Sequence, residues 1–279
     1  MTTSASTAST ASATTSVPAA GVVDRSLRKV PPMGGLNRTL AWIELKRVLR
    51  NRRTMIFSLV VPAAFYFLFG VGQTYTNDNA GRGNVGAFIM ISMALYGAMI
   101  STTGGGAMVA TERAQGWSRQ LRLTPLSPIA YVTIKVAVAM VLGLLSILVV
   151  YICGLFTHAK MDSPWLFVAT AAIAWAGSLV FAAFGLFMGY LLPSENVMQI
   201  LGPGLALLAF GGGLFIPLTD GSAFEIFARF TPMYGISKLA HAPLTGDTVQ
   251  WWWVANVVVW LAVFVGGAAW CLRGDTDRV

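Results

Sequence analysis

Charged residues are scarce in this sequence: Asp, Glu, Lys and Arg account for 11% of its 279 residues, against about 25% in a typical soluble domain. Hydrophobic residues account for 56%, and the mean hydropathy is +0.67. A chain with so few charges cannot cover a water-facing surface with polar side chains. The composition therefore excludes a soluble globular protein and indicates an integral membrane protein.

The patterns of several catalytic and binding sites are also missing. No Gly-x-x-x-x-Gly-Lys-[Ser/Thr] phosphate-binding loop occurs, so the chain lacks the usual P-loop site for ATP. No His, Cys, Asp and Glu residues have metal-ligand spacing, so we expect no metal and no cofactor on this chain. Cys153 and Cys271 lie in apolar runs and should be buried free thiols. His158 and His241 fall between apolar runs and should be solvated, although a nucleophile–base pair assembled by the fold stays open.

No acidic residue lies near the middle of an apolar segment. A proton-driven carrier usually needs such a carboxylate, so the chain is expected to be a passive conduit driven by another protein. Lys135, near the start of the third segment, should extend to the cytoplasmic face, and Glu195 should lie at the inner boundary. The alternative is a stand-alone secondary transporter or channel. A membrane enzyme acting on lipid would need clustered His, Asp or Ser at one interface.

Six apolar segments are each near the roughly 20 residues that a bilayer requires. They lack the strict alternation of a membrane β-strand, so all six are predicted to be helices. The sequence therefore predicts an all-α membrane protein with six transmembrane helices. The predicted spans are 55–72, 85–110, 129–156, 165–192, 197–217 and 251–272.

The region before the first span divides into two parts. Residues 1–36 are rich in Ser, Thr and Ala and predict a disordered cytoplasmic tail, which leaves 37–279 as the transmembrane domain. Residues 37–53 form an amphipathic helical pattern that is typical of a helix in the membrane interface. Its two arcs are Trp42, Leu45, Val48 and Leu49 against Lys46, Arg47, Arg50 and Arg53. The alternative is a basic flank that only follows the positive-inside rule.

The basic residues predict the orientation. Nine of the 19 Lys and Arg residues precede residue 54, which favours contact with anionic lipid rather than with nucleic acid. An N-terminus inside places 15 Lys and Arg residues in the inner segments and 4 in the outer ones. We therefore expect a multi-pass protein of the cell inner (plasma) membrane with both termini in the cytoplasm. Trp165, Trp251, Trp252 and Trp253 then anchor the outer interface.

The outer segment 218–250 is too long for a simple turn. Residues 222–230 could form a short helix, Thr231-Pro232 should break it, and 234–239 could form another. We expect a re-entrant or surface-lying helical hairpin, because irregular backbone at membrane depth must be sheltered by protein or water. Such a hairpin would be a lid over an exit path.

A charged, turn-rich segment separates the second and third spans. Glu112 to Leu123 could form about three helical turns, with Gly116 permitting a bend. Thr124-Pro125 should end that helix, since proline disfavours helical geometry in the preceding residue. The segment is either a helical positive-inside loop or a docking element for a cytoplasmic motor.

At these residues the sequence resembles the ABC-2 export permeases, particularly the daunorubicin-resistance type of drug and lipid exporter. That family carries Glu-Arg-x-x-Gly-x-x-x-x-Leu-x-x-Thr-Pro-x-[Ser/Pro] after its second span. The matching residues here are Glu112, Arg113, Gly116, Leu121, Thr124, Pro125 and Ser127. A weaker feature is the proline-centred segment 230–234 followed by 244–246. The resemblance covers about 38–272 and leaves out the N-terminal tail.

The resemblance implies a working assembly. Two six-span units, this chain with a second copy or a related permease, would pair with two separate P-loop ATPase subunits that hold ATP and Mg. The segment after span two is similar to the family's coupling helix, with candidate residues Glu112, Arg113, Gly116, Trp117, Arg119, Leu121, Arg122, Thr124 and Pro125. The interfacial helix would also touch the ATPase, through Trp42, Lys46, Arg47 and Arg50. The expected activity is export of an amphipathic or apolar drug, antibiotic or lipid, hence multidrug resistance.

The same resemblance places spans two and five at the interface between the two units. Candidate residues of the substrate path on these spans are Met93, Tyr96, Met99, Thr102, Thr103, Asn196 and Gln199. Methionine-rich surfaces adapt to varied apolar ligands. Met and aromatic residues at helical spacing also pack ordinary cores, and that alternative stays open.

Overall fold

A computed structural model describes residues 37–116, 126–215, 218 and 221–277, and its regular elements are helices. The predicted tail 1–36 lies outside these residues. The elements are α1 (Arg38–Leu49), α2 (Arg52–Gly70), the 3-10 helix η3 (Thr74–Asn77), α3 (Val85–Ala114), α5 (Pro128–Leu155), α6 (Pro164–Gly177), α7 (Leu179–Leu191), α8 (Ser194–Gly211), α9 (Ala223–Ala228), α10 (Pro232–Thr245) and α11 (Trp251–Asp277).

Polar caps fix where the long helices begin. The side chain of Asn84 accepts a hydrogen bond from Ala87 N–H at the start of α3, and Ser127 accepts one from Ala130 N–H at the start of α5. Proline follows the cap at α5 and α6, where its missing N–H leaves no helical hydrogen bond unmade. Each loop-to-helix transition is therefore encoded locally.

Within the part of the chain that the structure describes, four helical segments are long and apolar enough to cross a membrane: Val85–Ala114, Pro128–Leu155, Pro164–Leu191 and Trp251–Leu272. The pair α1 and α2, bent by 63°, would make a fifth. These correspond to five of the six predicted spans. The other, 197–217, corresponds to α8, which begins with Ser-Glu-Asn and contains Pro203. It is not among the candidate spans, so the count of six stays a prediction.

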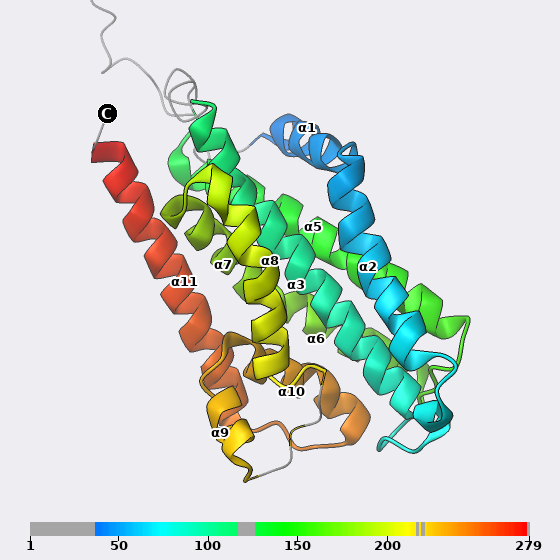
Figure 1. The fold of residues 1–279 in the computed structure, drawn as a ribbon. Coiled ribbons are helices and arrows are strands. Elements are labelled where there is room, and N and C mark those ends of the chain that lie inside the picture. The colour runs from blue at the N-terminus through cyan, green and yellow to red at the C-terminus, as the bar shows by residue number, and fades with distance from the viewer. Residues whose placement is uncertain (1–36, 117–125, 216–217, 219–220, 278–279) are drawn as a thin grey trace, which may run out of the picture.

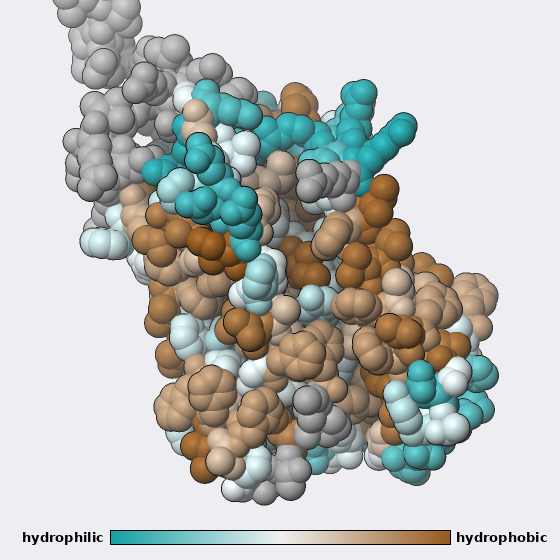
Figure 2. Space-filling model, in the orientation of Figure 1, coloured by the Kyte–Doolittle hydropathy of each residue, from teal (hydrophilic) through white to brown (hydrophobic). Residues whose placement is uncertain are grey.

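The helix α3 forms the centre of the bundle, with α2, α5, α7 and α8 packed around it (Figure 1). Its apolar window is 78% buried inside the chain, whereas that of α11 is 11% buried. The helix α1 lies at one end of the bundle and the α9–α10 hairpin at the other, and we call these the α1 end and the hairpin end. Brown apolar surface lies between teal polar surface at the α1 end and near η3 (Figure 2).

Glycines allow α3 to approach its neighbours closely. A Cβ at Gly106 would lie 2.6 Å from the carbonyl oxygen of Ala182 on α7, and one at Gly105 would lie 2.8 Å from Ala139 Cβ on α5. Gly104 on the same helix has nothing within 4 Å of an added Cβ. Small residues at such contacts bring backbones together, as is common between membrane helices.

Two expectations about the ends of elements are corrected. The helix α3 continues through Glu112 to Ala114, so Glu112 belongs to its last turn and not to a separate helix. The hairpin is helical and breaks at Thr231-Pro232 as expected, but α10 is embedded, not surface-lying. It packs against α11, α6 and α3, since most of its side chains are apolar.

Of the predicted tryptophan anchors, Trp165, Trp251 and Trp252 are exposed. Trp253 is buried against Ala228, Tyr234 and Ala242, so it packs the hairpin onto α11 and is not an anchor. Cys153 and Cys271 are free and only partly buried.

Adding one methyl group to α3 tests how closely α3 and α7 pack. Gly106→Ala is expected to lower the free energy of unfolding by about 1–3 kcal/mol, because the facing atoms are backbone and cannot move aside. Gly104→Ala is the matched control and should change it by less than about 1 kcal/mol. Thermal unfolding in detergent measures both, and equal effects would contradict the close contact.

Candidate functional site

Charged side chains from three helices meet at the α1 end of the bundle. Glu44 and Arg47 come from one face of α1, Glu112 from the last turn of α3, and Tyr131 and Lys135 from the first turns of α5. The spacings of three within α1 and four within α5 place each pair on one side of its helix. We call these five residues the charge cluster.

The cluster is a closed set of hydrogen-bonded ion pairs. Lys135 Nζ lies 2.9 Å from Glu44 Oε2 and 2.5 Å from Glu112 Oε1. Arg47 Nη2 pairs with Glu112 Oε1 and lies 3.0 Å from Glu44 Oε2. Tyr131 O–H donates to the other carboxylate oxygen of Glu112. Two acidic and two basic side chains therefore balance one another.

Because these charges are buried, they hold the three helices in this arrangement. The side chains of Lys135 and Glu112 are only 4% and 5% exposed, while Arg47 is 41% exposed at the rim. Val48, Ile134 and Val138 pack into an apolar cluster between α1 and α5. A charge in such surroundings is stable only while it is paired. Separating any two of the helices would leave a buried charge without its partner.

Sequence analysis identified Glu112 and Arg47 but not their relation, and it missed Glu44 and Tyr131. Lys135 was expected to extend to the cytoplasmic face; instead it is buried, because two carboxylates lie within its reach. Glu44 is the one acidic residue among the bases of 37–53. That contrast is the signal that could have marked it.

Arg113, the next candidate residue, fixes the end of α3 on its other side. Its Nη1 donates to the carbonyl oxygens of Tyr190 at 2.8 Å and Gly189 at 3.3 Å. The guanidinium lies 5.6 Å from the centre of the Tyr190 ring. A cation at the last carbonyls of α7 satisfies groups that the helix leaves unpaired.

Gly116 is the last described residue before the charged segment. It has φ +73°, a left-handed conformation that glycine adopts without strain, and it follows Gln115, the C-cap residue of α3. The chain therefore turns sharply there, as the sequence indicated. The remaining candidates, Trp117, Arg119, Leu121, Arg122, Thr124 and Pro125, lie outside the described residues.

The helix α1 is amphipathic, and its place in the membrane interface stays a prediction, but the edge that is buried within the protein differs from its apolar arc. Val48 and Glu44 are buried and Leu45 is half-buried, whereas Trp42 is 63% exposed and Leu49 is also exposed. The difference arises because α1 packs against α5 through its Glu44–Val48 edge. Lys46 and Arg50 are exposed beside the cluster.

The candidates for the substrate path divide into two groups. Those on α3 are packed within the chain: Met93, Tyr96, Met99, Thr102 and Thr103. The hydroxyl of Thr103 donates to the Phe181 carbonyl on α7 at 3.2 Å. Asn196 and Gln199, by contrast, are exposed on α8. A path through these residues stays a prediction.

The fold also assembles a serine–histidine pair near the hairpin end. His241 on α10 is buried, not solvated as expected, with Nε2 3.1 Å from Ser92 Oγ on α3 and Nδ1 2.8 Å from the Ser237 carbonyl. Burial lowers the pKa of His241, so the neutral ring is favoured. Ser92 is buried as well, which leaves no approach for a substrate. The pair therefore ties α10 to α3.

Another buried carboxylate joins the parts of the hairpin. Glu225 on α9 accepts hydrogen bonds from Gly221 N–H at 2.8 Å, Arg229 Nη2 at 2.9 Å and Tyr234 O–H at 3.0 Å. Asn256 on α11 donates to the Arg229 carbonyl at 2.8 Å. The loop, both helices of the hairpin and α11 are thereby joined.

Comparison with known proteins places these features in a family. The model of the ABC-2 type transporter family matches residues 36–240. A protein of Bacillus subtilis (strain 168) named "Putative transport permease YvfS" is 29% identical over 226 residues, which cover 80% of this chain and 91% of that protein. The family match begins just before α1 and ends within α10, so it includes the whole charge cluster.

Replacing the buried Lys135 tests whether the charge cluster stabilises the fold. Lys135→Met should lower the free energy of unfolding by about 3–5 kcal/mol, because Glu44 and Glu112 are left facing each other in an apolar setting. Adding Glu112→Gln should restore part of that loss, since one buried negative charge is then removed. Denaturation in detergent gives both values, with the exposed Lys160→Met as control. Additive losses in the double variant would contradict the network.

The hairpin should depend on pH through Glu225. Burial alone would raise its pKa, but the Gly221 N–H, Arg229 and Tyr234 outweigh burial and hold the pKa below the ordinary value. A lowered folded pKa stabilises the hairpin fully above the unfolded value of about 4.3, and the stabilisation is lost as pH falls through the folded pKa. Hydrogen exchange of 221–234, corrected for intrinsic rates, should therefore rise at low pH. Glu225→Gln should remove that rise, and an unchanged pH profile would refute the assignment.

Proposed function

This chain belongs to the ABC-2 type transporter family, and we propose that it is the membrane subunit of an ATP-driven exporter whose ATPase is a separate chain. ATP and Mg would be held by that partner and not by this permease. The substrate class that suits so apolar a chain is an amphipathic or apolar molecule, such as a drug, an antibiotic or a lipid. The working unit would contain two permease chains and two ATPase subunits.

The observation that carries the proposal is the charge cluster at the base of the charged segment. Segment 117–125 begins one residue beyond Gly116 and ends just before α5, so both its ends are anchored close to the cluster. Buried ion pairs gain little stability over an apolar core, but they fix one arrangement of the helices that carry them. A helix pair that receives force from a partner needs that kind of fixed arrangement.

Force on this end would then reach the opposite end through α3. The cluster joins α1 and α5 to the last turn of α3, and Arg113 joins the same turn to α7. At its other end α3 contacts α10 through Ser92 and His241. A tilt of α3 driven by the ATPase would therefore move the α9–α10 hairpin, which we propose as the outer gate. Glu112 is buried, so its role is to position the segment and not to contact the partner directly.

The orientation follows from the same features. The exposed Lys46 and Arg50 of α1 suit the anionic cytoplasmic leaflet, so the α1 end would face the cytoplasm with both termini. The hairpin end would face outward. The exposed apolar residues of α8, Met198, Ile200, Leu207 and Phe210, suit contact with a second permease chain along the path.

A pull-down in mild detergent tests the assembly. Tagged permease should retain a P-loop ATPase, identified by mass spectrometry. Arg119→Glu should lower export by tenfold or more while insertion and thermal stability stay unchanged, because the charged segment is placed at the partner. Lys160→Glu, an exposed charge near the hairpin end, is the matched control and should export normally.

Two results would overturn the proposal. Export that is unchanged by Arg119→Glu would remove the coupling role of the charged segment. Transport by the purified chain alone in liposomes, driven only by an ion gradient, would make it a secondary transporter or channel.

A further inference from the structure

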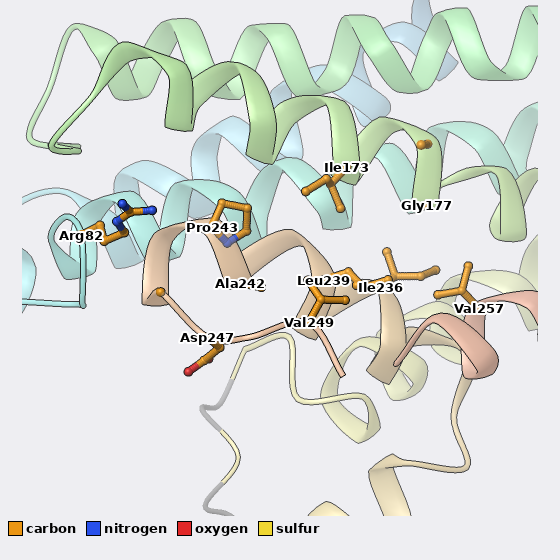
Figure 3. Close-up of a pocket in the computed structure, with 12 residues that line it drawn as sticks. Arg82, Ile173, Gly177, Ile236, Leu239, Ala242, Pro243, Asp247, Val249 and Val257 are labelled. Carbon is orange, nitrogen blue, oxygen red and sulfur yellow. The ribbon is translucent and has the colours of Figure 1, made fainter. Parts of the chain in front are cut away.

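A cavity of about 500 Å³ lies at the hairpin end, between α6, α10 and α11 (Figure 3). Its volume falls in the roughly 300–1,000 Å³ range of sites for small molecules. Aliphatic side chains form its interior: Ile173, Ile236, Leu239, Ala242, Val249 and Val257. Arg82 and Asp247 are the charged residues that line it. We call this cavity the α10 pocket.

Close contacts on both sides of α10 create the pocket. A Cβ at Gly177 of α6 would lie 2.6 Å from Ile236 Cγ2, so the missing side chain lets α10 approach α6. Gly235 gives a similar approach to α11, where its N–H donates to Asn256 Oδ1 at 3.2 Å. The helix α10 is thus the floor, while α6 and α11 stand on either side as walls.

In a bilayer, both walls would lie among the lipid hydrocarbon chains. Both belong to candidate membrane spans, and next to the pocket they expose apolar side chains, including Trp175 and Ala176 on α6 and Val258 on α11. Water in an apolar space of this kind finds few hydrogen-bond partners. An acyl chain from the adjoining bilayer loses no such partners when it enters.

The two charged residues at the rim indicate which headgroup a bound lipid would carry. Arg82 is held in place through its backbone, whose N–H donates to the Leu244 carbonyl at 2.7 Å. Its guanidinium has no ion-pair partner among the described residues. Asp247 accepts a hydrogen bond from Thr245 Oγ1 at 2.7 Å and is exposed. A guanidinium pairs well with phosphate, and a carboxylate pairs with an ammonium group.

We propose that the α10 pocket binds one acyl chain of a zwitterionic membrane phospholipid, with its phosphate at Arg82 and its amine at Asp247. The lining of this site includes none of the candidate path residues, and the site lies at the opposite end of α3 from the charge cluster. The bound chain braces α10 between α6 and α11. The proposal requires only that the chain lies in a bilayer, so it stands or falls separately from the ATPase partnership.

Photochemical labelling tests the acyl-chain half. Full-length protein in mild detergent is mixed with phosphatidylethanolamine that carries a photoactivatable group in one acyl chain, and labelled peptides are mapped by mass spectrometry. Label should concentrate in 164–177 and 232–249. Ala176→Trp, which fills the pocket from its rim, should lower that yield at least fivefold. Ala172→Trp lies one turn earlier on the same exposed helix, outside the lining, and should leave the yield unchanged.

Two rim variants test the headgroup half and keep the proposal open to test if Ala176→Trp fails to fold. Arg82→Gln and Asp247→Asn should each lower labelling about threefold or more, while the exposed Lys160→Gln should not. Phosphatidylglycerol with the same photoactivatable chain should label less, because its headgroup has no amine for Asp247.

Three outcomes would overturn the proposal. Labelling that ignores Ala176→Trp would mean ordinary contact of lipid with the outside of the bundle. Equal or stronger labelling by phosphatidylglycerol would remove the zwitterionic headgroup site. Displacement of the phospholipid by an equal concentration of a single-chain alkyl phosphate would assign the pocket to a single-chain amphiphile instead of a membrane lipid.

Discussion

Charges buried between apolar helices must stay with their partners, and this constraint governs the α1 end of the protein. Glu44, Glu112, Arg47 and Lys135 come from three helices, and together they are neutral. Moving one helix away would leave an unpaired charge in apolar surroundings. The free energy required is far above that of breaking a surface ion pair. The three helix ends therefore behave as one body. Two of these helices, α3 and α5, are the ones that precede and follow the charged segment in the chain.

The rest of the bundle carries that constraint from one end to the other. Glycines hold α3 against α5 and α7 with little free space, so α3 cannot shift without moving its neighbours. At the hairpin end the Ser92–His241 contact links α3 to α10, and Asn256 links the hairpin to α11. The first link is a buried hydrogen bond, and the second is a hydrogen bond at the exposed edge of the hairpin. A continuous set of contacts thus joins the charge cluster to the hairpin.

Hydropathy predicted most of the helices, because the length of an apolar run depends on the bilayer alone. Turn chemistry predicted the break at Thr231-Pro232 and the bend at Gly116. Hydropathy and turn chemistry could not predict the charge cluster, because Lys135 and Glu44 are 91 positions apart and no local pattern links them. His241 and Lys135 were assigned to water for a related reason. A polar side chain is read as exposed until the fold shows a partner for it. The buried face of α1 was likewise decided by α5, which a helical wheel of α1 does not contain.

We propose that α1 and the start of α5 move as one body when the proposed ATPase partner hydrolyses ATP. Spin labels at Lys46 and Thr133, both exposed, in a variant without Cys153 and Cys271, report the distance between these helices in the reconstituted complex. A second label pair, at Lys46 and Phe230 of the hairpin, reports the distance between the two ends. The account predicts that ATP binding changes the second distance and leaves the first unchanged. A change in the distance between Lys46 and Thr133 would contradict it.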